Sequence, residues 1–321
     1  MSEFDLIRTH FACLGGQRPD VILGVGDDCA LLQVPAGQDL AVSIDTLVAG
    51  VHFLLDGDPQ ALGHKSLAVG LSDLAAMGAE PAWATLALTL PPEWLHSRPD
   101  WLAGFCAGLD CLAREHGVAL VGGDTTSGPL AISIQVHGLV PHGQALRRGG
   151  ARPGDLVCVS GTLGDAGLAL RRVLGALSVT DALRLRLDRP TPRVSLGLAL
   201  RGLATAMIDC SDGLAADLGH ILVASGVGSE LDLARLPLSA EVAEVVGEGG
   251  DWSLPLASGD DYELCFTLPS EMRPDLASIA ARGGVDLRVI GHITEATGLC
   301  CRLPDGTDLA LEHTGYDHFA G

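Results

Sequence analysis

Lysine is almost absent from this chain: Lys65 is the only one among 321 residues. A P-loop needs the lysine of G-x-x-x-x-G-K-[ST], and that motif is missing, as is a G-x-G-x-x-G loop after the first predicted strand. The 20 basic residues face 40 acidic ones, which gives a formal charge of −20. We therefore expect neither a nucleic acid nor an anionic membrane surface as partner, and an anionic ligand would need bridging metal ions.

Paired cysteines and long apolar runs are lacking as well. The nine cysteines are odd in number and have no C-x-x-C spacing, which favours reduced thiols in a cytosol over disulfides. The acidic start at 1–5 does not have the layout of a signal peptide. The most apolar stretch, 66–90, is interrupted by Asp73, Glu80 and Pro81, so it does not predict a membrane span. These absences predict a cytoplasmic protein without a membrane segment.

The length and the 47% hydrophobic content are sufficient for two domains, each with a core. Segments of strand and helix character alternate in both halves, which predicts an α/β protein. The segment 147–155 combines charge, glycine and proline and is the best candidate for a boundary. We therefore predict an N-terminal domain at 1–146 and a C-terminal α/β domain at 147–321.

Four predicted elements matter for the site. Apolar residues at every second position from 130 to 136 predict a strand, and 66–77 has the length and composition of a helix. A strand at 40–44 is predicted to end at Asp45. Another at 118–121 is predicted to end at the Gly-Gly-Asp that contains Asp124.

Aspartate is abundant, and it recurs at the edges of apolar segments. Six such clusters contain Asp27 and Asp28, Asp45, Asp73, Asp124, Asp209 and Asp212, and Asp260 and Asp261. A carboxylate among apolar residues needs a cation, N–H donors or a route to water. Hard divalent cations take oxygen ligands. The pattern therefore predicts one metal site assembled from distant parts of the chain.

Each acidic cluster also has a purely structural interpretation. Asp73 is the only charge in the predicted helix 66–77, where it is either a metal ligand or a polar residue that meets solvent at a domain edge. Asp27 and Asp28 are either ligands or turn residues. Asp124 is either a ligand or a residue of an N-cap or tight turn.

Three further positions have two interpretations. Ser211 or Asp212 is expected to cap the helix that begins near residue 214, and the N–H groups of that helix could also hold a phosphate. His52, as a lone histidine, is either structural or a ligand contact. Arg148 is either a phosphate clamp or a solvated linker charge.

Seven segments in this order resemble the thiamine-monophosphate kinase family, in the superfamily of aminoimidazole-ribonucleotide synthetase-like ATP-binding enzymes. They are 26–30, 45–53, 71–79, 122–126, 209–214, 261–266 and 315–319, and the match covers nearly the whole chain. The resemblance implies ATP-dependent phosphorylation of thiamine monophosphate to thiamine diphosphate. It also implies mixed sheets and a homodimer whose N-terminal sheets meet in a barrel. The acceptor phosphate is already ionised, so we expect direct in-line, magnesium-assisted transfer without a covalent nucleophile or general base.

The resemblance also implies roles for individual residues. The Mg²⁺ ligands would be Asp28, Ser43, Ile44, Asp45, Asp73, Asp124, Asp209 and Asp212. The contacts with ATP would be Gly123, Asp124, Arg148 and Ser211, and those with thiamine monophosphate His52, Asp260 and Tyr316. Ile44 stands where the family often has threonine, so only its carbonyl could reach a metal. Asp260 stands where the family commonly has glutamate, which is one methylene longer.

Two alternatives remain open at this point. A sister enzyme of the superfamily could be aminoimidazole-ribonucleotide synthetase, selenophosphate synthetase or the hydrogenase-maturation dehydratase. The early segment has Cys13 but no lysine, and the chain ends at Gly321 without a cysteine, which argues against the last two. A non-catalytic calcium-binding module would predict D-x-D-x-D-G spacing, which is absent.

Overall fold

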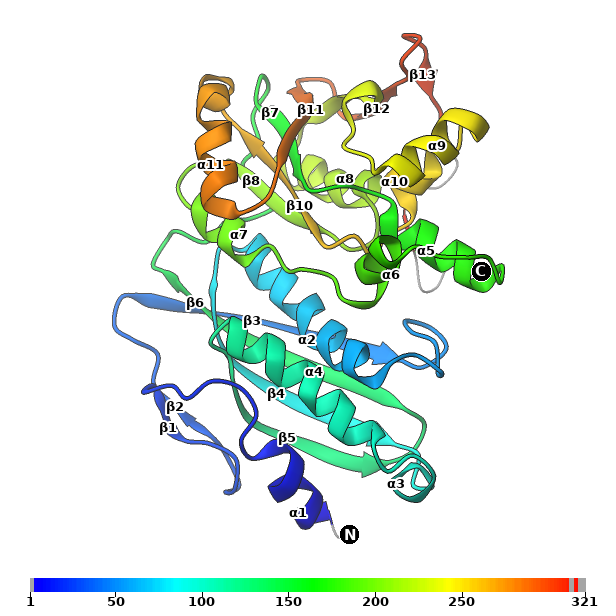
Figure 1. The fold of residues 1–321 in the computed structure, drawn as a ribbon. Coiled ribbons are helices and arrows are strands. Elements are labelled where there is room, and N and C mark those ends of the chain that lie inside the picture. Colours follow the sequence, from blue (N-terminus) through cyan, green and yellow to red (C-terminus); the bar gives the residue numbers. More distant parts are fainter. Residues whose placement is uncertain (1–2, 312–314, 317–321) are drawn as a thin grey trace. The chain divides into compact units, whose positions relative to one another are not determined.

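The computed structural model describes residues 3–311 and 315–316 (Figure 1). Two compact units divide them: the described residues up to Leu74 and from Ala79 to Gly143 form the first, and Ala75–Gly78 and those from Gln144 onward form the second. The sequence places 75–78 in the N-terminal domain. They belong to the second unit because the Met77 carbonyl accepts a hydrogen bond from Leu146 N at 3.0 Å.

The first unit contains a four-stranded mixed sheet with the order β3-β6-β4-β5. Its strands are β3 (Gln38–Val48), β6 (Ala131–Pro141), β4 (Glu80–Leu90) and β5 (Ala119–Ser127). β6 runs antiparallel to β3 and to β4, whereas β4 and β5 are parallel. Leu130, Ile132, Ile134 and Val136 are all buried, so the alternation predicted from the sequence is confirmed.

Two helices, α2 (Pro59–Ala76) and α4 (Trp101–Glu115), lie side by side across one face of this sheet (Figure 1). They approach each other closely because glycine stands at their contact. A Cβ on Gly63 would lie 1.9 Å from the carbonyl oxygen of Phe105, and one on Gly108 would lie 1.8 Å from that of Gln60. Any larger residue would force the two helices apart.

The opposite face of the sheet is only partly covered. Strands β1 (Val21–Leu23) and β2 (Leu31–Leu32) pack against the buried Trp83 and Ala119. Further along the same face the edge strand β3 leaves Val42 and Ile44 exposed. The first unit is completed by α1 (Glu3–Leu6), the π-helix Ile7–Phe11 and α3 (Trp94–Ser97).

The second unit is built on a seven-stranded sheet with the order β13-β12-β9-β11-β7-β10-β8. Its strands are β7 (Leu156–Ser160), β8 (Ala206–Cys210), β9 (Gly228–Asp232), β10 (Glu263–Leu268), β11 (Leu287–Thr294), β12 (Gly298–Arg302) and β13 (Asp308–Leu309). β12 and β9 are parallel and the other pairs are antiparallel. Every residue of β7, β10 and β8, three neighbouring strands of the sheet, is buried, so these strands form part of the core.

Seven α-helices and two short 3₁₀ turns accompany that sheet among the described residues. They are α5 (Asp165–Leu174), α6 (Asp181–Asp188), α7 (Val194–Leu200), α8 (Leu214–Ser225), α9 (Ala240–Gly249), α10 (Ser253–Ala257), α11 (Leu276–Gly283), and the turns Leu233–Arg235 and Ser270–Asp275. In the part of the chain that the structure describes, no helix has the length and apolar character to cross a membrane.

The mixed α/β class is confirmed, but two strand ends differ from the sequence prediction. Asp45 lies inside β3 and Asp124 lies inside β5, rather than at their ends. β3 stays in register with β6 over all eleven of its residues. The backbone ladder therefore continues past a polar side chain, because the pairing bonds come from the main chain.

Candidate functional site

An acidic pair, Asp45 on β3 and Asp73 on α2, lies between these two elements of the first unit. Ser43 and Asp45, two residues apart, share the face of β3 that is turned toward the helix. The Ser43 hydroxyl donates a hydrogen bond to Oδ2 of Asp73 on α2. Oδ2 of Asp45 is buried and finds no hydrogen-bond partner among the described residues. It lies beside Gly70, where an added Cβ would be 3.5 Å away.

The electrostatics of this pair favour a cation. Burial, and next the negative charge of Asp73, raise the pKa of Asp45 to about 6. A divalent ion would satisfy the unpartnered oxygen and remove the repulsion between the two carboxylates. Mg²⁺ is commonly held by one or two carboxylates, with water and substrate phosphates completing its shell. Two carboxylates and a hydroxyl fit that ion.

The described residues do not form a complete cage for a metal. Among 3–311 and 315–316, no three histidine, cysteine, aspartate or glutamate side chains are grouped as ligands of one ion. A magnesium ion at Asp45 and Asp73 would therefore take its remaining oxygens from water and phosphate.

Gly123 and Asp124 lie at the opposite edge of the sheet from Asp45. Asp45 pairs with Ile134 of β6. Ile134 pairs in turn with Leu86 of β4, and Leu86 with Gly123 of β5. Three strand spacings put about 14 Å between the ends of this row. Asp124 belongs to the next row, so its exposed side chain lies on the opposite face. Within this unit the sheet separates Asp124 from Asp45 in both position and face.

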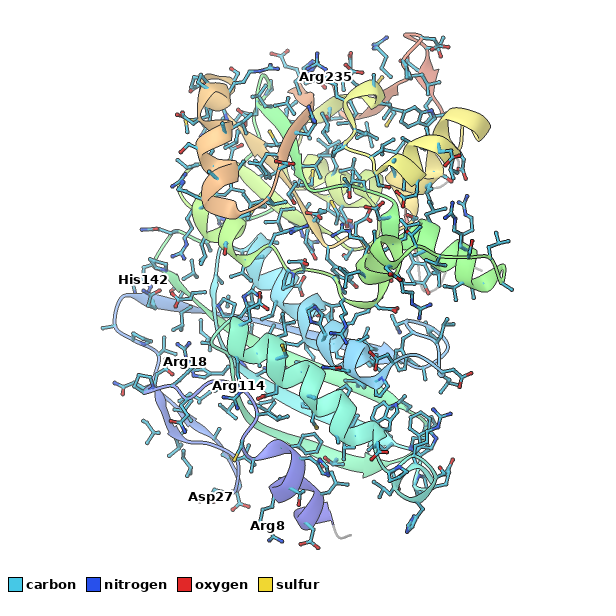
Figure 2. All side chains as sticks on the ribbon, viewed as in Figure 1. Arg8, Arg18, Asp27, Arg114, His142 and Arg235 are labelled. Atoms are coloured by element: carbon cyan, nitrogen blue, oxygen red, sulfur yellow. The ribbon has the colours of Figure 1, made fainter. Side chains whose placement is uncertain are left out.

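Asp28 and Ile44 also lie apart from the acidic pair. Asp28 is exposed in the turn between β1 and β2, where its N–H donates to Oδ1 of Asp27 at 2.8 Å. Figure 2 shows Asp27 at the outer edge of the first unit. This bond agrees with the turn interpretation of the two residues. The Ile44 side chain points away from α2, with 62% of its surface exposed.

His52 lies in the loop that follows β3, and the main chain holds its ring. Val48 N donates to Nδ1 at 3.0 Å, and His52 N donates to the Val48 carbonyl at 3.0 Å. Because Nδ1 accepts a hydrogen bond, the proton of the neutral ring is on Nε2. Arg98 braces the same loop by donating to the Leu55 carbonyl at 3.3 Å. His52 can therefore act as a hydrogen-bond donor through Nε2.

The second unit gathers five predicted residues near the start of α8. Asp209 is buried in β8, and Ser211 and Asp212 follow that strand. Asp260 N donates to the Ser211 carbonyl at 2.8 Å, and Tyr316 N donates to the Asp212 carbonyl at 3.0 Å. The backbone thus brings these five predicted contacts together: one with ATP, two with metal and two with the acceptor.

The predicted cap of α8 is wrong. The N-cap residue is Gly213, which has no side chain to accept a capping hydrogen bond. Instead Oδ2 of Asp217, within the helix, accepts hydrogen bonds from the N–H groups of Asp212 and Gly213, both at 3.1 Å. Burial and the nearby Asp212 raise the pKa of Asp217 to about 7. An acidic residue in the first helical turn was the sequence signal for this contact.

Arg148 lies at the other end of α8. Its carbonyl accepts a hydrogen bond from Ser225 Oγ at 3.3 Å, and Ser225 is the last residue of that helix. Ser211 precedes the first residue, and twelve helical residues span about 18 Å. Within this unit the fold therefore does not bring Arg148 beside Ser211.

A buried ionic network beside this site was not found from the sequence. Glu263, the first residue of β10, has no exposed surface. Arg193 donates to it from Nε at 2.7 Å and from Nη2 at 2.5 Å. Arg186 Nη2 lies 2.9 Å from Oε1, and Ser160 Oγ donates to Oε2 at 2.5 Å. A charged residue inside an otherwise apolar strand was the available signal.

Two family models define the class of protein. The AIR synthase related protein N-terminal domain matches residues 26–140, and the AIR synthase related protein C-terminal domain matches 152–301. The chain is thus a two-domain AIR synthase related protein.

Individual relatives narrow this class. The thiamine-monophosphate kinase of Escherichia coli strain K12 is 48% identical over 323 residues, which cover 99% of this chain and 98% of that protein. The crystal structure of thiamine-monophosphate kinase from Stenotrophomonas maltophilia K279a is 47% identical, with a TM-score of 0.84 and coverage of 91% and 93%. A structure of AaThiL complexed with AMPPCP and TMP is 32% identical, with a TM-score of 0.76 and 89% coverage of each chain.

The chain belongs to the thiamine-monophosphate kinase family. The resemblance predicted from the seven motifs is confirmed. The result favours this family over the sister enzymes and over a calcium-binding module.

Proposed function

We propose that this chain transfers the γ-phosphoryl group of ATP directly onto thiamine monophosphate, with Mg²⁺ assistance, to give thiamine diphosphate. Family membership and the AaThiL complex with AMPPCP and TMP support the two substrates. The observation in this chain that carries the proposal is the Asp45 and Asp73 pair, in which the buried Oδ2 of Asp45 has no hydrogen-bond partner among the described residues.

Phosphoryl transfer needs positioning and charge neutralisation rather than covalent chemistry. Mg²⁺, when bound, would bridge and neutralise the phosphate oxygens. Several Mg²⁺ ions would share these ligands: the side chains of Asp28, Ser43, Asp45, Asp73, Asp124, Asp209 and Asp212, with the carbonyl of Ile44. Ser43 orients the carboxylate of Asp73 through its hydroxyl hydrogen bond.

The chain's own residues would orient both substrates. Gly123, Asp124, Arg148 and Ser211 would contact ATP. His52 can donate from Nε2 to a phosphate oxygen, because Nδ1 accepts from Val48. The carboxylate of Asp260 suits the cationic thiazolium of the acceptor, and Tyr316 would complete that contact. The acceptor phosphate is already ionised, so no side chain has to remove a proton.

We also infer a homodimer whose N-terminal sheets meet in a barrel. In the described part of the chain, β3 is an edge strand that pairs on one side only. Its outer face leaves Val42 52% and Ile44 62% exposed. An edge strand of this kind invites pairing with another chain. A second copy on this face would also cover Asp124, which this unit keeps apart from Asp45.

The division of work between the domains is part of the same proposal. Residues 1–146 would bind ATP and Mg²⁺ and form the dimer, and 147–321 would complete the active site. A cytoplasmic setting is supported by the nine free cysteines.

An ATP-consumption assay tests the proposed function. The wild-type chain is incubated with MgATP and, separately, thiamine monophosphate, thiamine and the substrates of the sister enzymes. Of these acceptors, we expect only thiamine monophosphate to react, and to give ADP and thiamine diphosphate in equal amounts. We expect no turnover in excess EDTA. Turnover with a sister substrate instead, or with none of them, would refute the proposal.

A further inference from the structure

The loop that carries Asp260 has an unusual backbone. Of the described residues, three other than glycine have a positive φ, and two of them are Asp260, at 64°, and Tyr262, at 50°. Gly259 precedes them with a φ of 69°. Left-handed backbone is unfavourable for residues with a Cβ, and it persists only where the surroundings impose it.

Asp261, between these two residues, holds the loop in place through hydrogen bonds with the protein interior. Its side chain is buried, with 3% exposed. Both of its carboxyl oxygens accept from the N–H of Gly164, at 2.9 and 3.1 Å. Its carbonyl accepts from Arg186 Nη2 at 3.2 Å. These contacts fix Asp261 to the start of α5 and to the buried network around Glu263.

The neighbours of Asp261 are then fixed on the site side. Tyr262 N donates to the Cys210 carbonyl at 2.8 Å, and Asp260 N donates to that of Ser211 at 2.8 Å. The Tyr262 hydroxyl donates to Oδ1 of Asp260 at 3.0 Å, which sets the direction of that carboxylate. The two adjacent aspartates thus differ in environment, since Asp261 is buried and Asp260 is only partly buried, with its carboxylate held by Tyr262.

We propose that Asp261 and Tyr262 are positioning residues for the acceptor. They hold the backbone of Asp260 in its left-handed conformation and its carboxylate in the hydrogen bond from Tyr262. In this way they set the affinity for thiamine monophosphate and leave the affinity for ATP unchanged. This inference rests on the proposed function, because Asp260 is its acceptor contact. It adds two residues that do not themselves touch either substrate.

Steady-state kinetics of three variants test it. Tyr262→Phe removes one hydroxyl, and we expect KM for thiamine monophosphate to rise about tenfold, with kcat and KM for ATP within about twofold. Asp261→Ala removes the anchor, and we expect a rise of about 100-fold. Asp261→Asn keeps an oxygen that accepts from Gly164, and we expect it to restore KM to within about threefold of wild type.

Asp155→Ala is the matched control. Asp155 is another buried aspartate of this unit. It accepts hydrogen bonds from Arg152 N at 3.0 Å and from Thr205 Oγ1 at 2.7 Å. It directly precedes β7, whereas the buried network around Glu263 lies at the other end of that strand, at Ser160. We expect this variant to lower Tm and leave both KM values unchanged. A purely structural Asp261 would behave in the same way, with Tm reduced and no selective change in KM for the acceptor.

The outcomes separate the two levels of the proposal. A wild-type chain that makes no thiamine diphosphate refutes the proposed function. An active wild type, with Tyr262→Phe and Asp261→Ala unchanged in KM for the acceptor, overturns only the positioning inference. If Asp261→Ala shows no cooperative melting transition, the Tyr262→Phe result decides alone.

Discussion

The hydroxyl of Ser43 on β3 donates a hydrogen bond to the carboxylate of Asp73 on α2, and it ties the edge strand to the helix that covers the sheet. Around this contact α2 is almost wholly apolar, with Leu71 and Leu74 buried. Asp45, the second carboxylate, adds to the local negative charge, and its Oδ2 has no hydrogen-bond partner in the part of the chain that the structure describes. The predictions that follow start from this pair.

Replacing Asp73 by asparagine should separate function from stability. Asp73→Asn keeps an oxygen for the Ser43 hydroxyl but removes the charge that repels Asp45. We expect turnover to fall by about 100-fold or more, because a metal ligand is lost. In EDTA the free energy of unfolding should be unchanged, or higher by up to about 1 kcal/mol. Kinetics and urea unfolding check this, with Asp39→Asn, at an exposed position of β3, as control. Normal turnover would make Asp73 a structural residue only.

The stability of the metal-free protein should fall as the pH rises through the range where Asp45 titrates. Its pKa is about 6 in the folded state against 3.8 for the free side chain, so the folded state binds more protons between these values. The contribution of Asp45 to the free energy of unfolding is then complete below about pH 4 and is lost toward pH 6, by an amount on the order of 3 kcal/mol. Urea unfolding in EDTA across this range measures the slope. Asp45→Asn should make it shallower, the remainder coming from groups such as Asp217, whose pKa is also raised, to about 7. An unaltered slope would exclude Asp45 as a source.

His52→Asn tests the donor role of the histidine ring. Asparagine can still accept the hydrogen bond from Val48 N, but it lacks a donor at the position of Nε2. We expect KM for thiamine monophosphate to rise about tenfold, with Tm and KM for ATP nearly unchanged. A clear fall in Tm, together with a similar rise in the KM values for both substrates, would assign His52 a structural role instead.

A charge on the outer face of β3 should abolish the inferred dimer. Val42→Asp places a carboxylate where a second copy would bury it without a partner. We expect the wild type to sediment as a dimer and this variant as a monomer with little activity. Val223→Asp, at a position of α8 that is 83% exposed, is the control and should remain dimeric. A monomeric wild type would contradict the barrel directly.

Transfer in one step predicts inversion at phosphorus. A chiral γ-phosphate on ATP should appear in thiamine diphosphate with the opposite hand, because one in-line displacement inverts and two restore the configuration. No nucleophile paired with a base is predicted in the motifs, so a phosphoenzyme is not expected. Retention of configuration, or protein labelled by γ-labelled ATP alone, would require a covalent intermediate.

Local patterns in the sequence were sufficient for the class of fold and for the family. The alternation over 130–136 reflects a strand with one buried face, and the apolar run at 66–77 lies within α2 up to Ala76, where that helix ends. Seven short motifs in order were specific because each packs several polar and glycine positions into a few residues. Such motifs consist of adjacent residues, so they can be recognised in one sequence without knowledge of the tertiary contacts of those residues.

The relations between distant residues depended on the tertiary structure. Asp45 and Asp73 meet because α2 crosses the face of β3, whereas Asp124 is kept away because two strands lie between β3 and β5. The buried partners of Glu263 likewise come from separate segments of the chain. Strand order, register and face are set by long-range pairing and packing, and a one-residue shift in register reverses the face of every side chain. The sequence by itself determined which residues could take part in the chemistry, and the packing of the folded chain decided which of them stand together.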